Sequence, residues 1–192
     1  MPRLFTGIEI PEEQREELTR LRLPLPGNSR WIETENLHLT LRFAGDIDNA
    51  QAREFADRLA GITVDAFEMR LSGLGAFGGN EPRSIWAGID AGPELETLAR
   101  ACERAAREAG LAPETRTFKP HVTVARLKHA SARDIARVLG RIGAFRGRPF
   151  PVSRFVLFSS RPKLGGGPYV VEEAFPLRGG EFADFHDVEG GW

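Results

Sequence analysis

The spacing of apolar and polar residues divides the chain into segments of two kinds. Alternating or short apolar runs rich in β-branched and aromatic residues predict strands, and apolar residues that recur on one helical face predict helices. The predicted strands cover residues 4–10, 37–43, 67–77, 84–90, 121–127, 150–160 and 168–177. The predicted helices cover residues 11–23, 48–62, 93–110 and 131–143.

The same order of elements occurs twice. The segment FTGIE at residues 5–9 matches WAGID at 86–90, an offset of 81 residues. The strand that begins at His38 matches the one at His121, and strand 67–77 matches strand 150–160, each at an offset of 83. An internal repeat of this kind is stronger evidence for the fold than any single predicted element.

The repeat predicts an α+β fold built from duplicated β-α-β-α-β halves. We expect two mainly antiparallel sheets related by a pseudo-two-fold, with the helices outside and a central cleft. Residues 1–178 are predicted to form a single bilobal domain, with repeats at about 3–77 and 84–160. Residues 179–192 lie beyond the repeat and are expected to be a poorly ordered tail.

Two of the four histidines stand in matched strands, HLTLRF from His38 and HVTVAR from His121. Residues i and i+2 of a strand point to the same face, so His38 shares a face with Thr40, and His121 with Thr123. The apolar residues between them are expected to pack under the helices. A pseudo-two-fold would then bring both polar faces to the central cleft.

Two imidazoles on either side of a phosphodiester can act as a general acid and a general base near neutral pH. Threonine hydroxyls beside them can hydrogen-bond the phosphate oxygens without any metal. The alternatives are half-buried structural histidines and threonines placed by strand propensity. A metal site is less favoured, because zinc sites use three or four protein ligands and neither motif has a suitably spaced acid.

Strand parity also sorts the residues that follow each motif. Arg42 has the same parity as His38 and is expected to line the cleft as a substrate-binding residue. Arg126 comes five residues after His121, so it faces the cleft only if its strand bends or ends at Val124. Phe43 could stack on a base, but its parity favours the core.

Composition narrows the class of protein. The chain has 192 residues, of which 41% are hydrophobic and 28% charged, with a formal net charge of −1. This balance argues against a protein that coats long nucleic acid, although a local basic pocket could still bind an RNA end. The single Cys102 excludes an intrachain disulfide and a cysteine-rich metal site. No apolar run approaches the ~20 residues of a membrane span, and the start lacks a signal-peptide pattern, so we expect a cytoplasmic protein with no membrane partner.

The chain resembles the 2H phosphoesterase superfamily, which has two His-x-Thr/Ser-x motifs. More closely, it resembles the RNA 2′,3′-cyclic phosphodiesterases, also called 2′-5′ RNA ligases. The likeness spans about residues 3–177 and is carried by four segments: RLFTGIEIPEE (3–13), RWIETENLHLTLRFAGD (30–46), TFKPHVTVARLK (117–128) and LFSSRPKLGGGPYVVEEAFPL (157–177).

The resemblance implies hydrolysis of a terminal RNA 2′,3′-cyclic phosphate to a 2′-phosphate, or in reverse the joining of RNA ends. It makes His38 the proton donor, His121 the proton acceptor, Thr40 and Thr123 phosphate contacts, and Arg126 a further basic contact. It implies no metal or other cofactor. The expected partners are RNA ends or nucleotides with a 2′,3′-cyclic phosphate, and no obligate protein partner is predicted.

Two other functions fit the same residues. One is a 2H enzyme that acts on a small nucleotide such as an ADP-ribose cyclic phosphate. The other is a non-catalytic protein that binds RNA ends and retains the fold, against which the intact histidines and threonines of both motifs argue.

Overall fold

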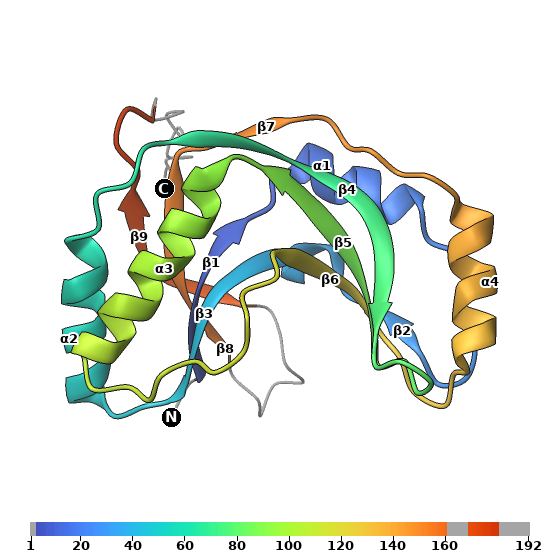
Figure 1. Ribbon diagram of the computed structural model, residues 1–192, viewed down its shortest axis with the longest axis horizontal. Helices are drawn as coiled ribbons and strands as arrows, with labels where there is room; N and C mark the ends of the chain where they lie inside the picture. The colour runs from blue at the N-terminus through green and yellow to red at the C-terminus, as the bar shows by residue number, and fades with distance from the viewer. Residues whose placement is uncertain (1–2, 161–168, 181–192) are drawn as a thin grey trace, which may run out of the picture.

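The computed structural model describes residues 3–160 and 169–180. Its elements, in chain order, form one curved sheet with four α-helices outside it (Figure 1). The strands are β1 (Arg3–Glu9), β2 (Arg30–Trp31), β3 (His38–Asp46), β4 (Phe67–Phe77), β5 (Ser84–Ala91), β6 (His121–Arg126), β7 (Phe150–Val152), β8 (Arg154–Ser160) and β9 (Val170–Pro176). The helices are α1 (Glu12–Arg20), α2 (Asn49–Ala60), α3 (Pro93–Glu108) and α4 (Ala132–Ile142), with a 3-10 turn η1 (Thr34–Asn36).

Two lobes meet at the centre of this sheet. The strand order is β7-β4-β5-β6-β3-β1-β8-β9, with β2 paired to the side of β6, and the strand pairings are antiparallel. The central strands β3 and β6 pair only at Leu39 and Val122. The predicted sheets are therefore joined at one point, and the pseudo-two-fold of the repeat passes between these two strands.

Each lobe takes one strand from the other repeat. In sequence β4 ends the first repeat, but it pairs with β5 of the second. In the same way β8 belongs to the second repeat but pairs with β1 of the first. We call this arrangement the strand exchange.

Local sequence signals explain where the helices begin. Asp48 precedes α2 and its carboxylate accepts a hydrogen bond of 2.8 Å from the Gln51 backbone N–H. Ser131 precedes α4 and its hydroxyl accepts one of 3.1 Å from the Asp134 N–H. Each satisfies a backbone donor that the helix itself leaves unpaired. α3 begins with Pro93, whose missing N–H costs nothing at that position.

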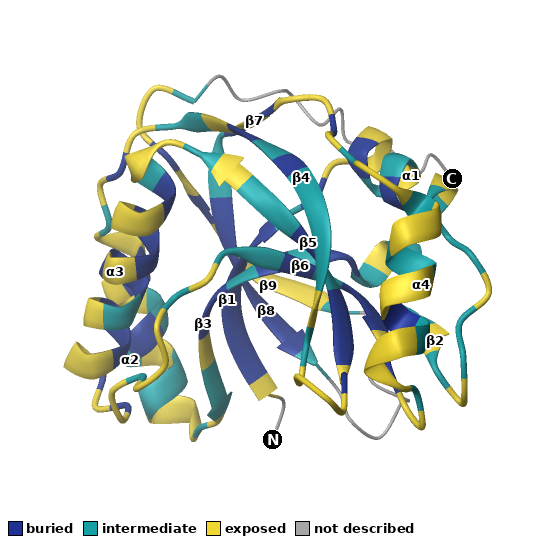
Figure 2. Ribbon diagram, turned by 45° about the vertical axis from the view of Figure 1, so that its right-hand side comes forward, coloured by how far each residue is buried: buried dark blue, intermediate teal, exposed yellow. Residues whose placement is uncertain are grey.

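The main core lies between the sheet and the helices. Leu39 and Val122, at the junction of the lobes, belong to the same buried cluster as Phe55 of α2 and Leu98 of α3. Figure 2 shows the buried residues on the strands and on the inner sides of the helices, with the exposed residues of the helices turned outward. The opposite face of β3 and β6 is therefore left for the polar side chains of both motifs.

The α+β fold and its mainly antiparallel pairing are confirmed, with two differences in detail. The predicted strand 150–160 is two strands broken at Ser153, because β7 pairs with β4 in one lobe and β8 with β1 in the other. The short strand β2 lies between predicted helix 11–23 and predicted strand 37–43, where no element was predicted. Of the predicted tail, all but Gly179 and Gly180 lies outside the described residues.

Candidate active site

The register of β3 and β6 brings the two motifs together. Leu39 faces Val122, and both side chains are fully buried on the helix side. Extending this antiparallel register by one residue each way places His38 opposite Thr123, and Thr40 opposite His121. All four side chains share the other side of the sheet, which we call the site face. Each histidine thus has a threonine beside it on its own strand and another across the junction.

Both imidazoles are held by the backbone in the same way. The His38 Nδ1 lies 2.7 Å from the carbonyl oxygen of Asn36, and the His121 Nδ1 lies 2.6 Å from that of Lys119. A carbonyl can only accept, so each Nδ1 carries the proton and donates it. Each Nε2 is then the atom that gains or loses a proton. The His38 Nε2 lies 3.1 Å from the Thr40 hydroxyl, within its own motif.

Aromatic rings surround the two histidines unequally. The His38 ring lies 4.9 Å from the Phe5 ring, 4.8 Å from Tyr169 in an edge contact, and 5.7 Å from Phe158. The His121 ring has one such contact among the described residues, with Phe77 at 5.0 Å. The first lobe therefore shields its histidine from water more than the second does.

This shielding has an electrostatic consequence. Burial lowers the pKa of His38 below its usual 6.5, because the charged imidazolium loses hydration. The Asn36 carbonyl opposes this by favouring the protonated ring, while the positive charges of Arg126 and His121 lower the pKa of His38 further. In the free protein, His38 is therefore mainly neutral at pH 7.

A β-bulge in each central strand changes which face the following residues occupy. The pairing of β1 with β3 shifts between Thr6 and Gly7, and that of β5 with β6 shifts between Ile85 and Trp86. A bulge adds one unpaired residue and reverses the alternation after it.

The two bulges fall at the same place in both repeats. Leu41 and Arg42 are consecutive buried residues in β3, as are Val124 and Ala125 in β6. The next residue in each strand, Phe43 or Arg126, then returns to the site face and is exposed. Arg126 and Phe43 are thus equivalent positions of the repeat.

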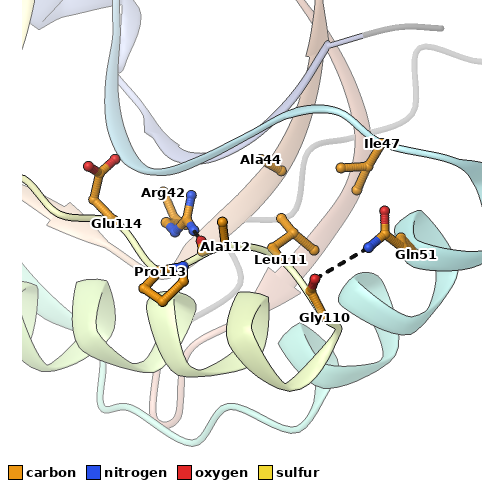
Figure 3. Close-up of a pocket in the computed structure, with 9 residues that line it drawn as sticks. All are labelled: Arg42, Ala44, Ile47, Gln51, Gly110, Leu111, Ala112, Pro113 and Glu114. Carbon is orange, nitrogen blue, oxygen red and sulfur yellow. Dashed lines mark hydrogen bonds between the residues drawn. The ribbon is translucent and has the colours of Figure 1, made fainter.

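The prediction that Arg42 lines the cleft is wrong. Only 7% of Arg42 is exposed, and its guanidinium lies on the helix side of the sheet. Its Nε pairs with Glu103 of α3, and its other nitrogens donate to the carbonyls of Phe43 and Ala112. Figure 3 shows Arg42 together with the segment from Gly110 to Glu114; these residues line a cavity of about 350 Å³.

The prediction that Phe43 packs in the core is wrong for the same reason. Its side chain is 43% exposed, and its ring stacks on Phe5 at 6.3 Å, beside His38. A signal for the bulge exists in the second motif, where Val124 and Ala125 are adjacent apolar residues that break the alternation. Asn36 was also missed; besides holding His38, its side-chain oxygen accepts a hydrogen bond of 3.3 Å from the backbone N–H of Tyr169.

The donor set of the site suits acid–base chemistry and phosphate binding. Within residues 3–160 and 169–180, no group of three or more His, Cys, Asp or Glu side chains is placed to hold a metal ion. No helix in this part of the chain is long and apolar enough to cross a membrane. The site face offers two imidazoles, two hydroxyls and the exposed guanidinium of Arg126.

A fold with two histidine–threonine strands joined about a pseudo-two-fold is that of the 2H phosphoesterases. The model of the 2′-5′ RNA ligase superfamily matches residues 10–163, and the chain belongs to this family. RNA 2′,3′-cyclic phosphodiesterases of Aquifex aeolicus and Thermus thermophilus are 31% and 33% identical to it, covering 92% of this chain in each case and 98% and 91% of their own lengths. The Aeropyrum pernix protein of the same name is 43% identical, over 52% of this chain and 57% of its own length.

Solved structures show the same fold. A Thermus thermophilus protein superposes with a TM-score of 0.77 at 27% identity, covering 92% of this chain and 98% of its own. E. coli LigT in complex with 3′-AMP superposes with a TM-score of 0.74 at 26% identity, covering 93% and 99%.

Proposed function

We propose that the protein hydrolyses the 2′,3′-cyclic phosphate at RNA ends to a 2′-phosphate, without a metal ion. The observation that carries the proposal is the pair of imidazoles on one face, each with its Nδ1 held by a carbonyl, which leaves its Nε2 as the atom for proton transfer. The names of the relatives support the substrate class. The proposed substrate carries a 2′,3′-cyclic phosphate, and the proposed reaction needs no cofactor.

In this mechanism each histidine moves one proton. The Nε2 of His121 takes a proton from the attacking water, and the water oxygen forms the new bond to phosphorus. The bond from phosphorus to O3′ breaks, and the Nε2 of His38 gives its proton to O3′. The product carries a 2′-phosphate and a 3′-hydroxyl. His38 is left neutral and His121 protonated, and proton exchange with water restores the starting state.

Thr40, Thr123 and Arg126 are proposed to bind the non-bridging oxygens as negative charge grows on them. The same displacement, with the 5′-hydroxyl of a second RNA strand in place of water, forms a 2′-5′ linkage. Arg42 has no part in this proposal, because its guanidinium is used on the other side of the sheet.

The lowered pKa of His38 requires that the substrate help to charge its own acid. An anionic cyclic phosphate beside the ring favours imidazolium and offsets the positive charge of Arg126. The donor therefore becomes charged mainly when the substrate is bound, which ties protonation of His38 to the presence of a leaving group.

The products of 2′,3′-cyclic AMP test the assigned roles. Two histidines fixed on adjacent strands admit one in-line orientation, so we expect a single isomer, formed equally well in excess EDTA. The roles that the family resemblance gives to His38 and His121 make this isomer 2′-AMP. Chromatography of the products identifies the isomer. A mixture of 2′- and 3′-AMP contradicts a single bound pose, pure 3′-AMP reverses the two roles, and loss of activity in EDTA that a divalent cation restores points to a metallohydrolase.

Alanine variants of the two histidines complete this test. His38→Ala and His121→Ala should each lower kcat by at least ~100-fold, the lower range for lost acid–base catalysis. His129→Ala is the matched control, because His129 is an exposed histidine in the turn after β6. Turnover near that of the unchanged protein in either site variant would rule out the paired mechanism, and binding without turnover in the unchanged protein would favour the non-catalytic alternative.

A further inference from the structure

The short strand β2 holds one arginine in a fixed place beside β6 (Figure 1). Arg30 pairs with Arg126 and Trp31 with Ala125. The hydrogen bond from the Ile32 N–H to the Val124 carbonyl measures 2.8 Å, and the Trp31 Nε1 donates to the Leu23 carbonyl at 2.8 Å. These contacts hold the backbone at Arg30 and the two residues after it, although the Arg30 side chain is exposed.

The register places two positive charges directly opposite one another. Facing residues of antiparallel strands share a face, with Cβ atoms roughly 4.5–5.5 Å apart, and like charges in such a pair repel. Across residues 3–160 and 169–180, neither Arg30 nor Arg126 forms an ion pair with a carboxylate. Other exposed arginines do, such as Arg20 with Glu16. Two exposed guanidinium groups that start from facing backbone positions, with no carboxylate partner among the described residues, are suited to an anion.

Arg126 connects the pair to the reaction site. Arg126 is on the site face and close enough to His38 to lower the pKa of that ring by its charge. Arg30 faces Arg126 from β2, which pairs with β6 beyond the junction of β6 with β3. Guanidinium groups bind phosphate oxygens through two parallel hydrogen bonds, and a single RNA strand presents its phosphates one nucleotide apart.

We infer that Arg30 forms a second phosphate subsite, which binds the phosphodiester preceding the terminal nucleotide of an RNA strand while Arg126 faces the cyclic phosphate. The inference rests on the proposed function and adds a contact by which the site would favour an RNA strand over a mononucleotide. A mononucleotide has only the cyclic phosphate and leaves Arg30 unused. The subsite recognises the backbone and is therefore indifferent to the base sequence.

Kinetics on two substrates test the subsite. The substrates are 2′,3′-cyclic AMP and a trinucleotide that ends in a 2′,3′-cyclic phosphate. Arg30→Gln should lower kcat/KM on the trinucleotide about tenfold, mainly by raising KM. The same variant should change kcat/KM on 2′,3′-cyclic AMP by less than about twofold. The slope of log(kcat/KM) against log[salt] on the trinucleotide should also become shallower by ~0.7, the value for one lost contact to a single strand.

The control is Arg53→Gln, which removes an equally exposed arginine from α2, on the helix side of the sheet. It should leave kcat/KM unchanged on both substrates, and both variants should have the melting temperature of the unchanged protein. Equal losses on both substrates, or no loss on the trinucleotide, would overturn the inference. A loss confined to an ADP-ribose cyclic phosphate would also overturn it, because the ligand would then be a nucleoside diphosphate.

A binding assay separates this inference from the proposed function. Fluorescence anisotropy measures the affinity for a labelled trinucleotide that ends in a 2′-phosphate and needs no turnover. If the unchanged protein hydrolyses neither substrate but binds this trinucleotide through Arg30, the proposed function fails and the subsite stands. If Arg30→Gln leaves that affinity unchanged, the subsite is wrong whether or not the protein hydrolyses cyclic phosphates.

Discussion

At the scale of single residues, the two histidines have the same backbone support but different surroundings. Asn36 and Lys119 hold their Nδ1 atoms alike, whereas the rings of Phe5, Tyr169 and Phe158 gather around His38. The sequence repeat predicts the likeness. It does not predict the difference, because Phe158 and Tyr169 come from strands and segments far along the chain. In the proposed mechanism, this difference distinguishes the acid from the base within a nearly symmetric pair.

The lowered pKa of His38 predicts a particular dependence on pH. The donor must be protonated, so kcat/KM, which reports the free protein, should fall as pH rises through a His38 pKa below 6.5. Bound phosphate favours imidazolium, so the corresponding fall in kcat should occur at higher pH. NMR titration of the free protein, with His38→Ala to assign the resonance, gives the pKa for comparison. An activity that rises as His38 loses its proton would make it the base.

The buried position of Arg42 predicts that its substitution lowers the stability of the protein rather than its affinity for the substrate. Arg42→Met leaves Glu103 and the Ala112 and Phe43 carbonyls without their donor, and removing one partner of a buried pair costs about 3 kcal/mol. Urea unfolding measures the change. The control is Arg20→Met, which breaks an exposed pair and should cost at most about 0.5 kcal/mol. A mutant of normal stability with a raised KM would instead support a role in substrate binding.

At the scale of elements, the sequence predicts which segments form strands and helices, and which face His38 and His121 occupy. It fails beyond the bulges, because a bulge depends on how β3 pairs with β1 and how β6 pairs with β5. Arg42 and Phe43 exchange faces for this reason alone. Strand β2 was not predicted, and β7 was predicted as one strand with β8. Segments of three residues or fewer show no periodicity of their own.

Two glycine substitutions test how closely β1 and β3 approach. An alanine Cβ at Gly7 would lie 2.5 Å from the Leu39 carbonyl oxygen, in backbone that also positions His38. Gly7→Ala should therefore destabilise the protein by about 2 kcal/mol and lower kcat.

The matched control is Gly140→Ala in α4, where nothing lies within 4 Å of the added Cβ. There the same change should stabilise the protein by ~0.5–1 kcal/mol through the loss of glycine's freedom in the unfolded chain. Thermal unfolding compares the two. Equal effects at both positions would contradict the close approach.

At the scale of the whole molecule, the strand exchange makes the two repeats depend on each other. A cut between Gly79 and Asn80, in the exposed turn after β4, separates the chain close to the boundary of the repeats. The first fragment keeps β4 but loses its partners β5 and β7, and β1 loses β8. We expect neither fragment to fold alone, by circular dichroism, and the mixture to refold with activity. Two fragments that each fold independently would contradict this dependence.

The pairing of Arg3 with Ser160 also sets an order of events during synthesis. The first strand leaves the ribosome long before β8 exists, and at 5–20 residues per second the wait is roughly 8–30 s. Through that interval β1 can pair with β3 on one edge, while its other edge stays open to any unpaired strand. A nascent chain of this protein therefore has to keep one apolar strand unmatched until β8 has been made. Its yield should depend on how quickly translation reaches β8 and on how well chaperones cover that edge.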